Sequence, residues 1–97
     1  MEKKITEHSI LYIEKNKTLM EVGFEIKDDF LIIHRTFVDD SLRGQGKAGF
    51  LMQEVKAYAM ENGLRIKATC SYARHYFEKT KDEIYFDDPS LKESCSL

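Results

Sequence analysis

The chain has 97 residues, of which 42% are hydrophobic and 33% are charged, and its formal net charge is −2. This length and balance indicate one small globular domain, residues 1–97, with a single modest core. The slightly acidic charge argues against a general nucleic-acid-binding protein, which needs a basic face.

The rest of the composition narrows the setting. No apolar run approaches the length of a membrane span, and the first residues lack the apolar core of a signal peptide, so we expect no membrane contact. The two cysteines, Cys70 and Cys95, do not form a disulfide framework, and the simplest interpretation is a reduced, cytoplasmic protein. The cysteines and histidines lack the spacing of a zinc site, so we expect no structural metal.

The first part of the chain predicts antiparallel strands. We expect the charged residues 1–8 to fray, a strand over 9–14 and a turn over 15–17. A half-buried strand follows, in which alternating residues point the same way: Thr18, Met20, Val22, Phe24 and Ile26.

A turn over 27–29 leads to the apolar run 30–38, the best candidate for a central strand. Strict alternation predicts one face made of Phe30, Ile32, His34, Thr36 and Val38. It predicts the other face from Leu31, Ile33, Arg35 and Phe37.

The second part of the chain predicts a βαβ unit. Residues 48–60 carry an apolar stripe at helical spacing and end at Asn62-Gly63, and residues 65–70 form a short strand. A right-handed crossover makes the two strands parallel. Ser71 is expected to cap a second helix, from 72 to about 79. Residues 84–86 form an aromatic patch that can dock, and residues 90–97 are expected to be loose.

These elements define the fold class. We predict an α/β (α+β) domain with a mixed β-sheet, in which antiparallel N-terminal strands precede the βαβ unit and a short C-terminal helix. Its core is expected to span about residues 9–80.

The loop 43–49, Arg-Gly-Gln-Gly-Lys-Ala-Gly, joins the central strand to the first helix. Its small residues let a ligand approach the backbone, and the helix behind them directs free N–H groups and its positive dipole end to that point. Such a loop can hold a phosphate or a pyrophosphate. It matches neither the Walker loop nor the dinucleotide fingerprint. From these observations alone, an ordinary tight turn remains the alternative.

Cys70 and His34 are the candidate catalytic side chains. Cys70 ends a strand just before a helix N-terminus, a position that stabilises a thiolate and at which α/β sheets bind ligands. The alternative is a small buried hydrophobic residue. His34 lies on the neighbouring strand and can face the same cleft, the alternative being a core histidine.

The pattern Arg43-x-x-Gly46-x-Ala48, directly after a central strand, resembles the GNAT superfamily of acetyl-CoA-dependent N-acetyltransferases. The runs 33–38, 42–49 and 69–72, followed by Tyr76-Phe77, resemble a minimal branch of about the length of this chain. The resemblance implies a GNAT-like sheet whose loop amides hold the pyrophosphate of CoA. The implied cofactor-binding residues are Val38, Arg43, Gly44, Gln45, Gly46, Lys47, Ala48, Gly49, Ser71 and Tyr76.

The resemblance also implies acetyl transfer from acetyl-CoA to an unidentified amine acceptor, either a small molecule or a protein. His34 would be a general base or orienter, and Cys70 a nucleophile or an acid. The branch lacks the N-terminal helical segment that normally builds the acceptor site, so this site is shallow or completed by a partner.

Two other interpretations remain. The chain can be an acyl-CoA-binding or sensing module without turnover, or a structural domain with an ordinary turn at 44–49. The sequence leaves the oligomeric state open, and an exposed strand edge near residues 9–14 can pair with another chain.

Overall fold

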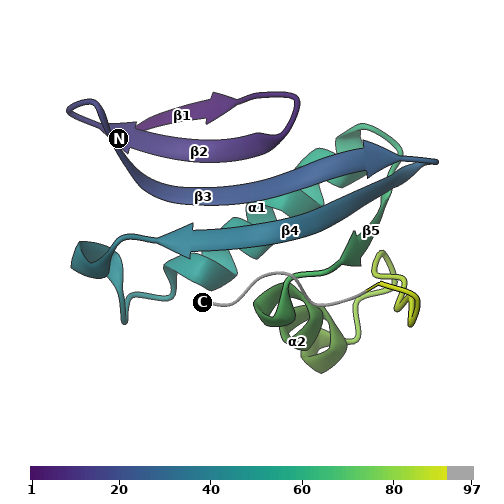
Figure 1. The fold of residues 1–97 in the computed structure, drawn as a ribbon. Coiled ribbons are helices and arrows are strands. Elements are labelled where there is room, and N and C mark those ends of the chain that lie inside the picture. Colours follow the sequence, from purple (N-terminus) through teal and green to yellow (C-terminus); the bar gives the residue numbers. More distant parts are fainter. Residues whose placement is uncertain (92–97) are drawn as a thin grey trace.

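The computed structural model describes residues 1–91, which form one five-stranded mixed sheet and two α-helices (Figure 1). The strands are β1 (Glu2–Ile5), β2 (Ser9–Glu14), β3 (Lys17–Lys27), β4 (Phe30–Val38) and β5 (Arg65–Ala68). They lie in the order β1-β2-β3-β4-β5, with antiparallel pairing except between β4 and β5. The helices are α1 (Lys47–Glu61) and α2 (Ser71–Thr80), and a short 3-10 helix, η1 (Asp40–Leu42), follows β4. The predicted mixed sheet, with antiparallel N-terminal strands before a βαβ unit and a short C-terminal helix, is confirmed.

β1 corrects the expectation that residues 1–8 fray. Glu2–Ile5 pairs with β2, from Glu2 opposite Ile13 to Ile5 opposite Ile10, so the edge of residues 9–14 is already occupied. The sequence of β1, Glu-Lys-Lys-Ile, has no alternation of apolar residues, because all four of its residues are exposed and none contributes to the core. The strand is held through its backbone and by an ion pair from Lys3 on β1 to Glu54 on α1, at 2.7 Å.

A β-bulge at His34 corrects the predicted faces of β4. Gly23 lies opposite Arg35 and Phe24 opposite Ile33, so His34 is an extra residue on β4. The buried face therefore changes parity at this point, from Leu31 and Ile33 before the bulge to Thr36 and Val38 after it. The predicted burial of Ile26 is also wrong, since it lies at the end of β3 and is 46% exposed.

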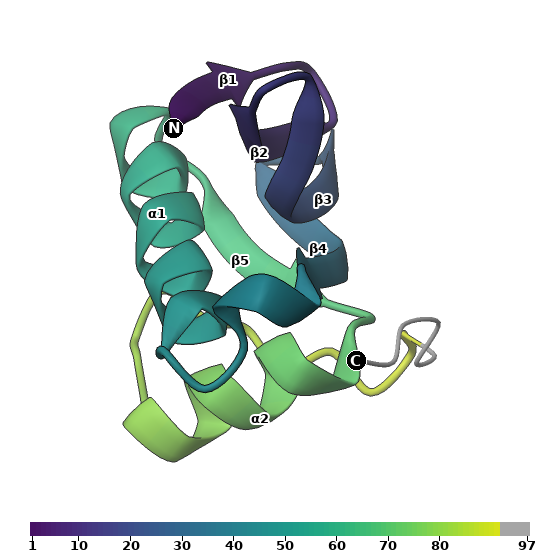
Figure 2. The same ribbon diagram turned by 90° about the vertical axis from the view of Figure 1, so that its left-hand side faces the viewer.

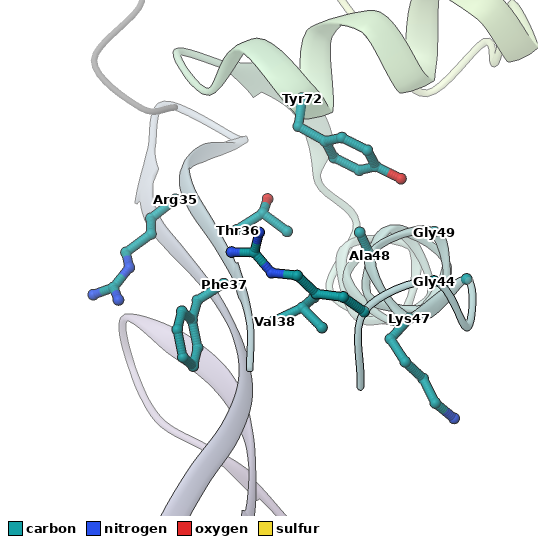
Figure 3. Close-up of a pocket in the computed structure, with 11 residues that line it drawn as sticks. Arg35, Thr36, Phe37, Val38, Gly44, Lys47, Ala48, Gly49 and Tyr72 are labelled. Carbon is teal, nitrogen blue, oxygen red and sulfur yellow. The ribbon is translucent and has the colours of Figure 1, made fainter. Parts of the chain in front are cut away.

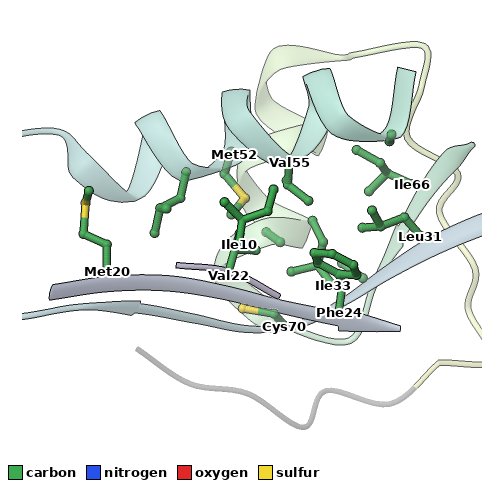
Figure 4. Packing of buried hydrophobic residues seen from close by; sticks show 14 of the residues in the cluster. Ile10, Met20, Val22, Phe24, Leu31, Ile33, Met52, Val55, Ile66 and Cys70 are labelled. Carbon is green, nitrogen blue, oxygen red and sulfur yellow. The ribbon is translucent and has the colours of Figure 1, made fainter. Parts of the chain in front are cut away.

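The core lies between α1 and one face of the sheet (Figures 2 and 4). Leu51, Val55 and Ala59 of the predicted stripe are fully buried against apolar residues of β3, β4 and β5. Burial of this stripe, rather than helix propensity, accounts for the position of α1. The helix ends where Asn62-Gly63 predicts, with Gly63 at a φ of 67°.

α2 lies beyond β5, at the end of the sheet, and its buried residues are Ala73 and Phe77. β5 ends at Ala68, two residues earlier than predicted, and Cys70 rather than Ser71 is the N-cap residue of α2. Ser71 is the first residue of the helix, so its predicted capping role is wrong.

The segment 84–86 docks along the outer edge of β5. Ile66 donates its N–H to the Ile84 carbonyl at 2.9 Å, and Phe86 donates to the Ile66 carbonyl at 2.8 Å. The ring of Tyr85 stacks on Phe77. Within residues 1–91, no helix is long and apolar enough to cross a membrane. Most of the predicted loose tail, including Cys95, lies outside the described residues.

Candidate functional site

The site begins where β4 and β5 part. Their parallel pairing ends at Ile33 opposite Ala68. The N–H groups of Thr69 and Cys70 both donate to the Ile33 carbonyl, at 2.9 and 3.2 Å, and the chain then turns into α2. Beyond the bulge, residues 35–38 of β4 pair with β3 alone, which opens the β5-facing edge of β4 at the carboxyl ends of the two parallel strands.

A pocket of about 450 Å³ lies at this open edge, between β4 and the start of α1 (Figure 3). Thr36 and Val38 point into it, whereas the side chains of Arg35 and Phe37 point to the other side of β4. Tyr72 reaches it from α2. Its lining residues are Arg35, Thr36, Phe37, Val38, Arg43, Gly44, Gly46, Lys47, Ala48, Gly49 and Tyr72.

One end of the pocket has the backbone features of an anion-binding site. Gly44 and Gly46 have φ values of 81° and 72°, which favour glycine. Gly46 is the N-cap residue of α1 and supplies no side-chain cap, and the first backbone bond of the helix runs from the Phe50 N–H to the Gly46 carbonyl. The N–H groups before Phe50 therefore have no helix carbonyl to bond and lie at the positive end of the helix dipole.

Two cations flank these amides. Lys47 and Arg43 both line the pocket, and Arg43 is held by an ion pair from its Nε to Asp40 at 3.0 Å. Backbone donors, a helix N-terminus and two positive side chains together match the charge and the acceptor oxygens of a pyrophosphate.

Most of the predicted cofactor-binding residues come together here. Those that line the pocket are Val38, Arg43, Gly44, Gly46, Lys47, Ala48 and Gly49. Ser71 and Gln45 are not part of the lining, and the Gln45 side chain donates to the Ser41 carbonyl instead. Tyr76 packs behind Gly49, where its ring lies 3.7 Å from the point that a Cβ on Gly49 would occupy, and its hydroxyl accepts a bond from Gln53.

Cys70 lies directly behind the pocket wall. The side chain is fully buried, and its Sγ lies 3.6 Å from the Oγ1 of Thr36, which does line the pocket. Cys70 is also the N-cap residue of α2, so its thiol lies near the positive end of that helix.

His34 lies on the face of β4 opposite to the one that carries Thr36. Its Nε2 is 3.1 Å from Glu25 Oε1 and its Nδ1 is 2.8 Å from Thr69 Oγ1. The bulge turns Thr36, and not His34, toward Cys70, so the expectation that His34 and Cys70 face the same cleft is wrong. His34 is not part of the pocket lining.

Sequence reasoning missed four lining residues: Arg35, Thr36, Phe37 and Tyr72. Thr36 could have been predicted to line the pocket, because it lies two residues before Val38 and therefore on the same face of β4. The alternation of apolar residues does not reveal the bulge at His34. Tyr72 is two residues after Cys70, in the first turn of α2. Burial, then the neighbouring Tyr76 and Cys70, raise the pKa of the Tyr72 hydroxyl above its usual value near 10.

Comparison with known proteins identifies the family. Residues 9–88 match the sequence profile of the GCN5-related N-acetyl-transferases. The chain belongs to this family. The fold is also similar to the NMR solution structure of a GCN5-like protein from Staphylococcus aureus whose proposed activity is N-acetyl transfer, with a TM-score of 0.72 and 32% sequence identity. That match covers 92% of this chain and 91% of the other.

Among curated proteins, no match to the chain was found. As a GNAT protein, the chain is assigned to the acetyltransferases, whose family cosubstrate is acetyl-CoA. The donors and cations of the pocket described above suit the charge of a pyrophosphate, a group that acetyl-CoA carries.

Proposed function

We propose that this protein transfers the acetyl group of acetyl-CoA to an amine acceptor, with the pyrophosphate of CoA bound by residues 43–49. The observation that carries the proposal is the convergence of this loop, the α1 N-terminus and the open edge of β4 on one pocket. The loop amides are the hydrogen-bond donors, and Arg43 and Lys47 add charge.

The open edge of β4 has a second part in the proposal. From the pyrophosphate at the loop 43–49, the pantetheine arm runs along β4 from Val38 toward Thr36. It thereby enters the gap where β4 and β5 part. A strand edge offers the N–H and C=O groups that amides of an extended ligand can pair with. This direction brings the thioester to the part of the pocket next to Cys70.

His34 is proposed as a general base or orienter on the acceptor side. Its position on the other face of β4 lets an acceptor approach from there. The Glu25 carboxylate can only accept a hydrogen bond when ionised, so a neutral His34 bonded to it carries its proton on Nε2 and leaves Nδ1 as an acceptor for Thr69. Cys70 is proposed to act on the acetyl-CoA side.

Calorimetric titration with acetyl-CoA tests the cofactor part of the proposal. Lys47→Glu places a carboxylate in the first turn of α1, where it suits the helix dipole but repels the pyrophosphate. We expect affinity to fall about tenfold or more, equivalent to about 1.4 kcal/mol. The matched control is Lys4→Glu on exposed β1, which changes the net charge equally and should leave affinity unchanged. Equal affinities in all three proteins, or no binding to the native one, would contradict the proposal.

A second candidate function is binding or sensing of an acyl-CoA without turnover. The observation that favours it is that neither Cys70 nor His34 lines the pocket. This candidate predicts tight acetyl-CoA binding, no acetylation of any amine in a panel of peptides, polyamines and small amines, and slow hydrolysis at most. Acetylation of one amine, lost on truncation of Cys70, would exclude it.

A further inference from the structure

Thr36 is the side chain that connects the buried cysteine to the pocket. Its Oγ1 lies 3.6 Å from Cys70 Sγ, within hydrogen-bonding reach of a thiol, and the Thr36 side chain points into the pocket. Thr36 is 3% exposed and Cys70 is 0% exposed, so the thiol meets the pocket through this hydroxyl. The bulge at His34 is what gives Thr36 this orientation.

This arrangement separates the two roles open to Cys70. A nucleophile must bring its sulfur to the thioester carbon, but Cys70 does not line the pocket and the Thr36 side chain lies between its thiol and the pocket. An acid needs only a hydrogen-bonded path for its proton, and a hydroxyl supplies one because it accepts one bond while it donates another. The packing therefore favours the acid.

We propose that Thr36 relays the proton of the Cys70 thiol to the sulfur of CoA as the acetyl group leaves. The inference rests on the proposed acetyltransferase function. The acceptor nitrogen forms its bond to the acetyl carbon, and the C–S bond breaks with its electron pair remaining on sulfur. Thr36 donates its hydroxyl proton to that sulfur and takes the thiol proton of Cys70 in return.

The remaining protons also balance. The attacking amine loses one proton to His34 or to water, and the Cys70 thiolate regains one from water once the products leave. The products are an N-acetylated amine and CoA with a free thiol.

The environment of Cys70 suits a proton donor. The thiolate left on Cys70 lies at the N-terminus of α2, whose dipole stabilises negative charge. Burial raises the pKa of Tyr72, the other hydroxyl side chain that lines the pocket, and so makes it a poorer donor than an ordinary tyrosine.

The test measures the release of CoA from acetyl-CoA, with n-butylamine as the acceptor probe. Thr36→Val keeps the shape of the side chain and removes the hydroxyl, and Cys70→Ala removes the proton source. We expect each variant to lower kcat at least about tenfold with an unchanged KM for acetyl-CoA. Thr36→Ser should restore the rate, and the double variant Thr36→Val/Cys70→Ala should be no slower than either single variant. Tyr72→Phe should have the smaller effect.

Several results would overturn the relay. One is a Thr36→Val protein with native kcat, and another is acetyl-Cys70 in the mass spectrum of protein incubated with acetyl-CoA. Loss of acetyl-CoA binding in Thr36→Val would make Thr36 a binding residue instead. If Thr36→Val does not fold, Cys70→Ala tests the same path from its other end.

Failure of the proposed function has a different signature. In that case the native protein itself binds no acetyl-CoA or releases no CoA, and the relay falls with it. If the native protein turns over and the variants do too, the relay alone is wrong.

Discussion

The two halves of β4 perform different tasks, although both belong to one strand. Residues 30–33 pair with β3 on one side and with β5 on the other. Residues 35–38, after the bulge at His34, pair with β3 only and line the pocket with their other edge. The first half bonds to a neighbouring strand along both of its edges, whereas the second half leaves one edge to the pocket. The bulge separates them, because it reorients the strand where β5 turns away.

Deletion of His34 should break this difference most strongly. Without the extra residue the existing pairs of β3 and β4 form a regular ladder, in which Leu31, Ile33, Thr36 and Val38 still share the buried face. We therefore expect a folded protein with a regular, straighter β4, a closed pocket edge and acetyl-CoA turnover at background level. Circular dichroism and calorimetric titration check the two halves of this prediction. His34→Ala keeps the bulge and should still bind acetyl-CoA; equal binding by the deletion variant would contradict the role of the bulge.

Truncation of one buried residue in each half should separate stability from binding. Leu31 is fully buried, and Leu31→Ala should cost about 2–5 kcal/mol of unfolding free energy without changing the affinity for acetyl-CoA. Val38 is 9% exposed and lines the pocket, so Val38→Ala should cost clearly less and should weaken binding. Urea denaturation and titration measure the two effects, and a reversed pattern would refute the division of β4.

Alanine at a positive-φ glycine should sharpen the contrast at the loop that follows β4. Gly46 and Gly63 have similar φ values, 72° and 67°, and neither has a neighbour that an added Cβ would meet. Each change to alanine should cost about 1–2 kcal/mol of unfolding free energy, since the left-handed conformation is strained for other residues. Only Gly46→Ala should also weaken acetyl-CoA binding. Equal effects of the two variants on binding would mean that the loop has no specific part in it.

The smallest predicted effect is a change in the pH dependence of stability, and it concerns the contacts around Phe30, at the start of β4. Lys67 contacts the ring of Phe30 and pairs with Asp88 at 3.0 Å. Hydrogen bonds from Ser90 and Lys67 lower the pKa of Asp88 from 3.8 to about 2.

Because the pKa of Asp88 is lower in the folded state, its stabilisation is complete above its unfolded pKa and is lost as the pH falls toward 2. Asp88→Asn should therefore reduce the loss of stability between about pH 4 and 2. Urea unfolding at several pH values in this range measures the slope of the unfolding free energy against pH. Other carboxylates with lowered pKa values, such as Asp82, keep this slope above zero in the variant. An unchanged slope would show that the Asp88 contacts do not persist in solution.

Several elements followed from the sequence because their signals are local. The alternation in β3, the apolar stripe of α1 and the stop at Asn62-Gly63 depend on residues a few positions apart, and the structure has these elements at nearly the predicted bounds. The loop 43–49 is local too, and every one of its residues except Gln45 lines the pocket. Gly44 and Gly46 have the positive φ that a strand-to-helix turn favours in glycine.

The tertiary structure decided the features that depend on a neighbouring strand. β1 exists because β2 offers a backbone edge, and its exposed residues carry no apolar pattern that could reveal it. The bulge belongs to the pairing of β3 with β4, and it turns Thr36 toward Cys70 and His34 toward Glu25. Periodicity describes a strand by itself, whereas register is a property of two strands, so the chain's chemistry-bearing residues were visible in the sequence but their pairing was not.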